Sequence, residues 1–398
     1  MTRRIHLGLS TCPNDTFTFH ALLAGEIPTP GLEFEIELMD VEALNERLGD
    51  GGFDAAKGSF HAALLSDGDL GVLPSGSALG FGNGPLLLST ELGRTPQAGD
   101  RILCPGRHTT ASFLQRLYYP EARAEQCVFS DILPALEDGR VPFGVCIHEG
   151  RFTYADHGLH LVEDLGQRWE RETGTALPLG GIFARPHLGQ DTLRSLQKAI
   201  RASLDWARAH PEATLPTMRH YAQEFSDAVL MAHVDLYVNQ WTRDLGRMGQ
   251  AALATLALNG VQAGILPEGT APLRVLGRPR LFHLCEPDAA RSLLESRASA
   301  PLPLRPESLQ REGFVHLSEE HQLTGTLETH FAQSRAVYLL ELDGDRVGAE
   351  VDWEPSRGGE SFPHLYREIE RADVVHHWSL EAEPGQTLEA PPLGSPTL

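Results

Sequence analysis

Apolar and polar residues alternate in two short segments near the start of the chain. In RIHLGLS, the side chains of Ile5, Leu7 and Leu9 share one face, and LEFEIELMD alternates again with its glutamates on the outer face. A period of two residues predicts half-buried β-strands. The polar segment TCPND lies between them and precedes TFTFHALLAG, so we expect Asn14 or Asp15 to cap a helix there.

Strand-like and helix-like segments continue to alternate over the first half of the chain. FDAAKGSFHAALL is interpreted as a short strand, a Gly-Ser turn and a helix, and RILCPGRHTTASFLQRLYY as a strand, a loop and a helix. This α/β alternation predicts parallel or mixed sheets with helices on both faces. From about Asp191 to Ala263 the pattern becomes helical, with a break expected at HPEATLPTM. Two α/β lobes followed by helices indicate a cleft, where ligands bind at the carboxyl ends of strands.

The length of 398 residues predicts two or three domains. LPEGTAPLRVLGRPR is rich in Pro and Gly and is expected to be a linker. The predicted boundaries are a first lobe over about 1–92 and 186–266, a second lobe over about 93–185, a linker over 267–280, a small α+β domain over 281–380 and a disordered tail over 381–398.

The net charge of −21 argues against nucleic acid and anionic membranes as partners, but it leaves room for a small anionic ligand at a local site. No run of some 18 apolar residues and no apolar leader segment occurs, so we predict a cytoplasmic protein without a membrane partner. The five cysteines fit no zinc or redox spacing, and we expect no metal. The sequence carries no signal for the oligomeric state.

His148 ends the apolar segment GVCI and is a candidate base. HEGRF is not a zinc motif, because a histidine would have to stand four residues on, where Phe152 stands. A residue just past a strand end projects into the cleft, and a neutral imidazole there can accept a proton. The alternative, a polar residue that only marks the strand end, stays open. Glu149 either orients the ring or is solvated.

Two loops are candidates for holding an anion. STCPNDT and GRHTTAS each lead from a predicted strand into a helix N-terminus, where free N–H groups and hydroxyls suit a carboxylate or phosphate. Ser10, Asn14 and Thr109 are their candidate contacts. Plain helix capping by Asp15 and Thr109 is the alternative.

Lysine is scarce in this chain, and Lys57 precedes Gly58 and Ser59 at a predicted strand-to-helix turn. It is either a cation in the cleft or a surface charge. GFGNG lacks dinucleotide-binding spacing and is expected to be a crossing or hinge between the lobes.

Several of these stretches, in order, resemble the 1,4-dihydroxy-6-naphthoate synthase family. They are STCPNDTFTF, KGS, SGSALGFGNGPLL, PGRHTTASFL, IHEGRFTY, LPLGGIFAR and HVDLYVN, and together they cover about Arg4 to Ala263. Two positions depart from the family pattern: Thr11 stands where proline is familiar, and Gly150 where serine is.

The resemblance implies a two-lobed fold of the type II periplasmic-binding-protein kind over about 1–266. It also implies a lyase of menaquinone biosynthesis, without a cofactor, that cleaves cyclic dehypoxanthine futalosine to 1,4-dihydroxy-6-naphthoate and dihydroxyacetone. His148 would be its base. Lys57, Gly58, Ser59, Thr110 and Ala111 would contact the substrate. A chorismate dehydratase-like enzyme and a small-anion-binding protein of the same fold are the alternatives.

The stretches GFVHLS and WEPSRGGESFPHLY resemble a small bacterial family of uncharacterised function, associated with the ADP-ribosyltransferase-like fold. That resemblance implies a nicotinamide-dinucleotide pocket near His316, Ser318 and Glu360. Glu360, His364 and Tyr366 are expected in one polar loop. A capped turn packed on a small mixed sheet is the alternative.

Overall fold

The computed structural model describes residues 2–66, 70–148, 150–222, 226–294, 302–356, 359–383, 386–391 and 393. The chain divides into two compact units, Met1–Gly277 and Arg278–Leu398. The division falls inside the segment 267–280 that was expected to be a linker. Part of that segment is a strand of the first unit, because Arg274 and Val275 pair with Gly71 and Val72.

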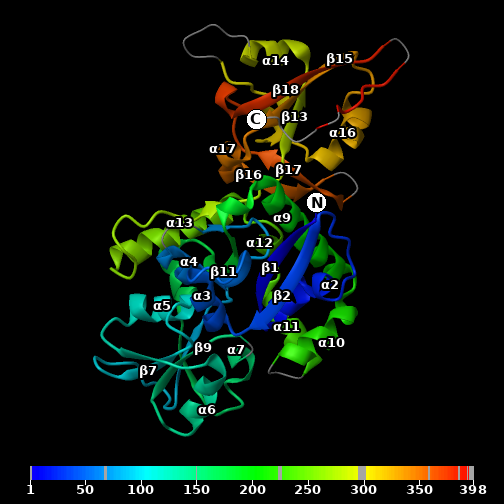
Figure 1. Ribbon diagram of the computed structural model, residues 1–398. Coiled ribbons are helices and arrows are strands. Elements are labelled where there is room, and N and C mark those ends of the chain that lie inside the picture. The colour runs from blue at the N-terminus through cyan, green and yellow to red at the C-terminus, as the bar shows by residue number, and fades with distance from the viewer. Residues whose placement is uncertain are drawn as a thin grey trace. The chain divides into compact units, whose positions relative to one another are not determined.

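Two sheets organise the described part of the first unit (Figure 1). The larger sheet has the order β12-β4-β11-β3-β1-β2, with β5 also paired to β11. Its strands are β1 (Arg3–Ser10), β2 (Leu32–Met39), β3 (Ala55–Ser59), β4 (Gly71–Val72), β5 (Ala78–Gly80), β11 (Leu177–Ala184) and β12 (Arg274–Val275). The smaller sheet has the order β10-β6-β9-β7-β8. Its strands are β6 (Leu86–Ser89), β7 (Arg101–Cys104), β8 (Arg123–Gln126), β9 (Phe143–Cys146) and β10 (His160–Asp164).

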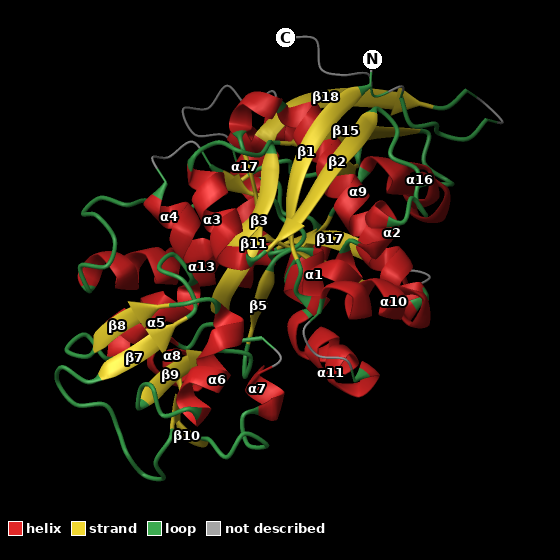
Figure 2. Cartoon of the chain, turned by 60° about the horizontal axis from the view of Figure 1, so that its bottom comes forward, coloured by secondary structure: helices red, strands yellow, loops and turns green. Residues whose placement is uncertain are grey.

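Each sheet belongs to one lobe, and helices complete both lobes. The first lobe contains α1 (Pro13–Thr18), α2 (His20–Leu23), α3 (Val41–Gly49), α4 (Phe60–Leu65), α9 (Gln190–Ala209), α10 (Pro211–Tyr221), α11 (Asp227–Tyr237), α12 (Gln240–Arg243) and α13 (Gly246–Gln262). The second contains α5 (Thr110–Tyr118), α6 (Ile132–Glu137), α7 (Gly150–Thr153) and α8 (Leu165–Thr173). Figure 2 shows α3 and α4 on one side of the larger sheet and α2 and α9 on the other. The mixed sheets with helices on both faces are those that the alternating pattern predicted.

The lobe boundaries differ from the expected ones. β6 lies in the smaller sheet although 1–92 was assigned to the first lobe, and β11 lies in the larger sheet although 93–185 was assigned to the second. The buried strand β11 fills the gap between β3 and β4, with which it pairs antiparallel. The crossing before β6 contains the GFGNG segment, at the place where a hinge was expected.

Two expectations about helix ends need correction. Neither Asn14 nor Asp15 caps the first helix: α1 begins at Pro13, with Cys12 as the preceding residue, and both polar side chains are buried within the helix. Proline suits a first helical position, since its missing N–H would have no partner there. HPEATLPTM breaks the long helix at His210, but most of it then forms α10.

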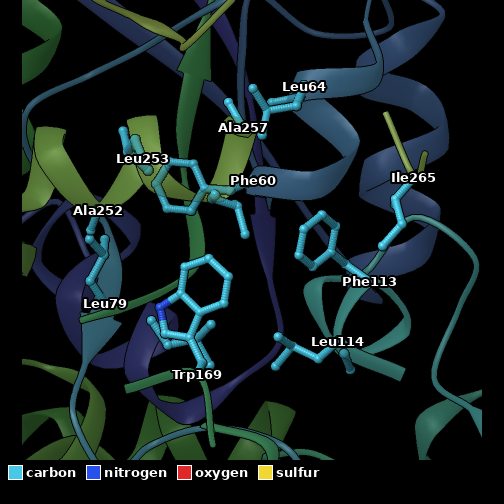
Figure 3. Close-up of a cluster of buried hydrophobic side chains, with 14 of the residues drawn as sticks. Phe60, Leu64, Leu79, Phe113, Leu114, Trp169, Ala252, Leu253, Ala257 and Ile265 are labelled. Carbon is cyan, nitrogen blue, oxygen red and sulfur yellow. The ribbon is translucent and has the colours of Figure 1, made fainter. Parts of the chain in front are cut away.

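A single cluster of buried side chains joins the two lobes (Figure 3). It combines Phe60 of α4, Phe113 of α5, Trp169 of α8 and Leu253 of α13. Each such side chain contributes roughly 1.5–3 kcal/mol when fully buried. The cluster therefore holds α5, which belongs to the second lobe, against α4 and α13 of the first.

The second unit contains two small sheets in its described residues. One is formed by β13 (Leu281–Cys285), β15 (Ala336–Leu342) and β18 (Val374–Glu381), and the other by β14 (Val315–His316), β17 (Ser361–Leu365) and β16 (Val351–Pro355). Its helices are α14 (Pro287–Leu294), α15 (Glu307–Arg311), α16 (Leu323–His330) and α17 (Gly344–Val347). This is the small α+β domain that was expected.

Two expectations about the second unit are only partly met. The expected polar loop is partly a strand, since His364 lies in β17. In the tail 381–398, Glu381 ends β18, and Leu388 and Leu393 pack in an apolar cluster with Phe282. Residues 384–385, 392 and 394–398 of that tail lie outside the described residues. Within the described residues, no helix has the length and hydropathy needed to cross a membrane.

Candidate active site

A cavity of about 90 Å³ in the first unit gathers all the cleft residues that the sequence pointed to. Its wall includes Ser10, Asn14, Lys57, Gly58, Ser59, Thr109, Thr110, Ala111 and His148. These residues come from the end of β1, from α1, from β3, from the start of α5 and from the turn after β9. They meet because strand ends and helix starts lie at the same edge of such sheets.

His148 stands in the turn between β9 and α7, with a backbone φ of 57°. This left-handed conformation is uncommon for residues other than glycine. The imidazole lies 3.4 Å from Cys12 Sγ at both ring nitrogens, edge-on to Phe129 and stacked with His233. Burial and, second, the charge of Lys57 lower the pKa of His148 to about 4. The ring is therefore neutral at pH 7 and able to accept a proton.

Lys57 is a buried cation, which rules out the surface-charge alternative. It lies within β3 and not at a turn, and only 5% of it is exposed. Its Nζ donates to Asp15 Oδ1 at 2.6 Å and to the Gly76 carbonyl at 3.1 Å. Burial raises the pKa of Asp15, and Lys57 offsets part of this rise. An ammonium group has three N–H donors, so these two described contacts leave one for a ligand in the cavity.

The start of α5 forms another part of the cavity wall. Thr109 caps the helix, since its side chain accepts from Ser112 N at 3.2 Å, so the capping interpretation holds at this loop. Thr110 Oγ1 donates to the Leu179 carbonyl at 2.8 Å and so ties α5 to β11. The first-turn N–H groups of a helix have no partner within the helix. Those of Thr110 and Ala111 are thus suited to an anion in the cavity.

The helix α11 supplies residues to which sequence reasoning gave no role. His233 is fully buried, and its Nε2 lies 3.1 Å from Asn14 Oδ1. Tyr237 lines the cavity. Both belong to the HVDLYVN stretch, which is one of the motifs shared with the family. That motif was the signal from which His233 and Tyr237 could have been proposed as site residues. The sequence also did not identify Cys12 and Asp15 as residues of the cavity, because their partners His148 and Lys57 are far away in the sequence.

Residues 5–260 match the model of a family described as menaquinone biosynthesis. The chain belongs to this menaquinone biosynthesis family. A 1,4-dihydroxy-6-naphthoate synthase from Thermus thermophilus is 43% identical over 274 residues, which cover 68% of this chain and 99% of the relative. Another, from Streptomyces coelicolor, is 39% identical over 270 residues, covering 66% of this chain and 95% of the relative. The chain is thus an enzyme of menaquinone biosynthesis.

The fold of this family member is that of periplasmic binding proteins. The alkanesulfonate-binding protein SsuA from Xanthomonas axonopodis pv. citri, bound to MOPS, superimposes with a TM-score of 0.55 at 11% identity, over 68% of this chain and 97% of SsuA. At that identity the likeness concerns the fold alone. Residues 287–377 match a separate family of proteins of unknown function, DUF952.

Glu42 and His108 form a contact between the lobes next to the cavity residues Val41 and Thr109 in this member of the menaquinone biosynthesis family. The carboxylate of Glu42, on α3, accepts from the backbone N–H of His108 at 3.1 Å and lies 2.9 Å from its ring Nδ1. A side chain at Gly106 would meet the same carboxylate at 2.5 Å. The cavity of about 90 Å³ is smaller than the roughly 300–1,000 Å³ of most ligand pockets, so a larger ligand must widen the cleft.

One departure from the family pattern has a local structural reason. A Cβ at Gly150 would lie 2.6 Å from Cys146 Sγ, so the familiar serine does not fit beside this cysteine without a shift. Nothing in the structure explains Thr11. Glu149, whose role was left open, lies outside the described residues.

Arg151, from the same motif, does not line the cavity but holds the crossing between the lobes. It donates to the Gly84 carbonyl and to Asp164 Oδ2, the latter at 2.5 Å. Gly84 itself packs against Gly166 so closely that a Cβ would lie 2.3 Å from the Gly166 Cα. Arg151 therefore fixes the geometry of the chain where it passes from one sheet to the other.

Arg151→Met is expected to destabilise the first unit by about 3–5 kcal/mol, because it leaves the buried Asp164 carboxylate without its cation. Calorimetric unfolding of the full chain measures this change. Arg140→Met is the matched control in the same lobe, since Arg140 is exposed and pairs only loosely with Asp138 at 3.5 Å. Equal unfolding temperatures for the two variants would show that the contacts of Arg151 with Gly84 and Asp164 do not stabilise the first unit.

The second-unit candidates are only partly brought together. His316 and Ser318 line a separate cavity of about 670 Å³. Glu360 is not among its lining residues, and its carboxylate instead accepts from Gln322 Nε2 and lies 2.9 Å from His321 Nε2. His364 and Tyr366 both contact the Glu354 carboxylate at 2.7 Å. The three residues expected in one polar loop therefore divide between two carboxylate-centred clusters.

Proposed function

We propose that the first unit cleaves cyclic dehypoxanthine futalosine to 1,4-dihydroxy-6-naphthoate and dihydroxyacetone, with His148 as the base. The observation that carries the proposal is the neutral imidazole of His148 beside the buried Lys57 ammonium, in a chain 43% identical to a protein named for this product. The proposed chemistry needs no metal or organic cofactor.

Each part of the cavity has a role in this proposal. The substrate carries an aryl carboxylate, which Lys57 Nζ and the N–H groups at the start of α5 would hold and orient. The sugar-derived ring would then face His148. Removal of a proton from that ring by His148 leaves an electron pair that drives carbon–carbon scission, and the second ring becomes aromatic. Aromatisation supplies the driving force, so a positioned base suffices to start the reaction.

Closure of the cleft supports the same chemistry. The Glu42–His108 contact joins the lobes next to the cavity residues Val41 and Thr109, and exclusion of water on substrate binding would strengthen electrostatic interactions inside the cavity. Burial is the main cause of the lowered pKa of His148, so the ring stays neutral in mildly acid solution as well. Substrate binding and closure of the lobes around a neutral base are thus the parts of the proposed cycle.

The proposal predicts which substrate the protein turns over. The purified full-length chain is incubated separately with cyclic dehypoxanthine futalosine and with chorismate, and the products are followed by naphthoate absorbance and by chromatography. We expect naphthoate and dihydroxyacetone in equal amounts from the first substrate and no reaction of the second. Turnover of chorismate would favour the dehydratase alternative, and binding of an anion without turnover of either would favour a binding protein.

A further inference from the structure

Residues 108–110, at the start of α5, are each bonded to a different element of the first lobe. Their partners are the side chains of Glu42 on α3 and His61 on α4 and the carbonyl of Leu179 in β11. Because α5 belongs to the second lobe, all of these bonds join the two lobes. Bonds from several elements to one helix start fix both the position and the direction of the helix.

The Glu42 carboxylate is the first of these partners. The backbone N–H of His108 donates to Oε1 at 3.1 Å and to Oε2 at 3.2 Å, and the ring Nδ1 lies 2.9 Å from Oε1. Asn45 Nδ2 donates to the same carboxylate at 3.2 Å and to Ser59 Oγ at 3.1 Å, and Asn45 Oδ1 accepts from Ser59 N at 2.7 Å. Ser59 lines the cavity, so a continuous series of hydrogen bonds links a cavity residue of the first lobe to the start of α5.

His61, which is fully buried in α4, is the second partner. Its Nδ1 lies 3.1 Å from the Thr109 carbonyl oxygen, which can only accept, so Nδ1 carries the hydrogen. The same carbonyl accepts the first bond within α5, from Phe113 N at 3.1 Å. The Phe113 ring also packs edge-on against the His61 ring, with their centroids 5.4 Å apart. His61 therefore holds both the capping residue and the first turn of α5.

These bonds determine where the helix start presents its free N–H groups. Thr110 and Ala111 line the cavity beside the bonded residues, and Lys57 lines it from β3 of the first lobe. Hydrogen bonds depend steeply on distance and angle. The N–H groups of α5 and the ammonium group can therefore hold one carboxylate only while the helix start keeps its place relative to Lys57.

We propose that Glu42 and His61 are positioning residues, which hold the start of α5 so that its N–H groups and Lys57 form one subsite for the substrate carboxylate. Each acts through a neighbour, Glu42 through His108 and His61 through Thr109. The inference rests on the proposed function of the first unit and extends it, because it assigns the alignment of the carboxylate to side chains that act from outside the subsite.

The test uses the full-length chain and pairs each disruptive substitution with a conservative one. Glu42→Ala and His61→Leu remove the two contacts. Glu42→Gln keeps an oxygen that can accept from His108 N, and His61→Asn keeps an N–H donor near the place of Nδ1. Glu46→Ala, at an exposed position of the same helix α3, is the matched control.

Two measurements separate carboxylate binding from the chemical step. Calorimetric titration with 2-naphthoate and with the uncharged 2-naphthamide measures the subsite, and steady-state turnover of cyclic dehypoxanthine futalosine gives kcat and KM. We expect Glu42→Ala and His61→Leu each to weaken naphthoate binding and raise KM by about tenfold while kcat changes by less than about threefold, because they weaken hydrogen bonds that the ground state and the transition state share. Naphthamide binding should change less.

The conservative variants test whether the hydrogen bonds are the cause. Glu42→Gln and His61→Asn should bind naphthoate within about threefold of the parent chain, since each keeps one bond to the helix start. Calorimetric unfolding of every variant accompanies the titrations. Glu42 is only partly buried, so Glu42→Ala decides the question if His61→Leu does not fold.

Several outcomes would overturn the proposal. They are naphthoate binding by Glu42→Ala equal to that of Glu46→Ala, a loss of kcat without a change in naphthoate affinity, and conservative variants that bind as weakly as the disruptive ones. Absence of naphthoate binding by the parent chain at about 5 mM would overturn it as well, because no carboxylate subsite would then exist. If the parent chain binds naphthoate in a manner that depends on Glu42 but does not turn over cyclic dehypoxanthine futalosine, the positioning role stands and the proposed reaction alone is wrong.

Discussion

His148→Asn is expected to lower kcat by about 10²–10⁴-fold, the usual contribution of a positioned base. Asparagine is the substitution of choice, because it tolerates the left-handed backbone at this position better than alanine does and so preserves the turn. Steady-state turnover of cyclic dehypoxanthine futalosine measures the loss. His187→Asn, at an exposed histidine of the same unit, is the matched control and should keep full activity.

The pH dependence of the parent enzyme tests the same role without a mutation. The base must be neutral, and its pKa is lowered to about 4, so protonation removes it only as the pH falls toward that value. The dependence of kcat/KM on pH should therefore lack an acid limb near the ordinary histidine pKa of about 6.5. Near-normal turnover in His148→Asn, or an acid limb of kcat/KM near pH 6.5, would contradict the role of His148 as the base.

Asp15→Asn is expected to destabilise the first unit by about 3–5 kcal/mol, because it leaves the Lys57 ammonium buried without a counter-charge. For a unit of this size that corresponds to a fall in unfolding temperature of about 2–4 °C for each kcal/mol. Calorimetry of the full chain measures it. Glu91→Gln, which removes an exposed pairing with Arg94, is the control and should cost less than about 1 kcal/mol.

A double variant separates the charge effect from packing. Asp15→Asn combined with Lys57→Met removes both charges, and a buried pair replaced as a whole is often nearly neutral for stability. We therefore expect the double variant to be more stable than Asp15→Asn alone, although it should lose affinity for the anionic substrate. A double variant that is less stable than either single one would mean that packing, and not the unpaired charge, explains the loss.

Local sequence patterns predicted the strands and helices of the first unit well, but they did not predict which residues and strands contact one another across the fold. The alternation of Ile5, Leu7 and Leu9 identified β1, because strand periodicity depends only on near neighbours. Asp15 was interpreted as a helix cap, yet its partner Lys57 lies 42 residues away, a distance over which spacing carries no information. The lobe boundaries failed for the same reason, since the pairing of β11 with β3 is decided by the whole sheet.

The cleft residues were predictable because several independent stretches pointed to one place. Each stretch ended a strand or began a helix, and the fold brings such ends to a common edge. His283 offered no comparable signal. A single histidine in the apolar strand LFHLC looks like an ordinary core residue, and only the three-dimensional contacts show that its Nε2 has no hydrogen-bond partner among the residues the structure describes.

The backbone conformation of His148 is one that stability alone does not favour for a residue with a side chain. A glycine would adopt the φ of 57° without the steric cost that a β-carbon brings, so selection for stability alone would favour glycine there. A side chain that persists in such a conformation is typical of residues retained for what they do to a ligand. Replacing His148 by glycine would relieve this steric cost, but it would also remove the ring contacts with Phe129 and His233 and, under the proposed mechanism, the base itself.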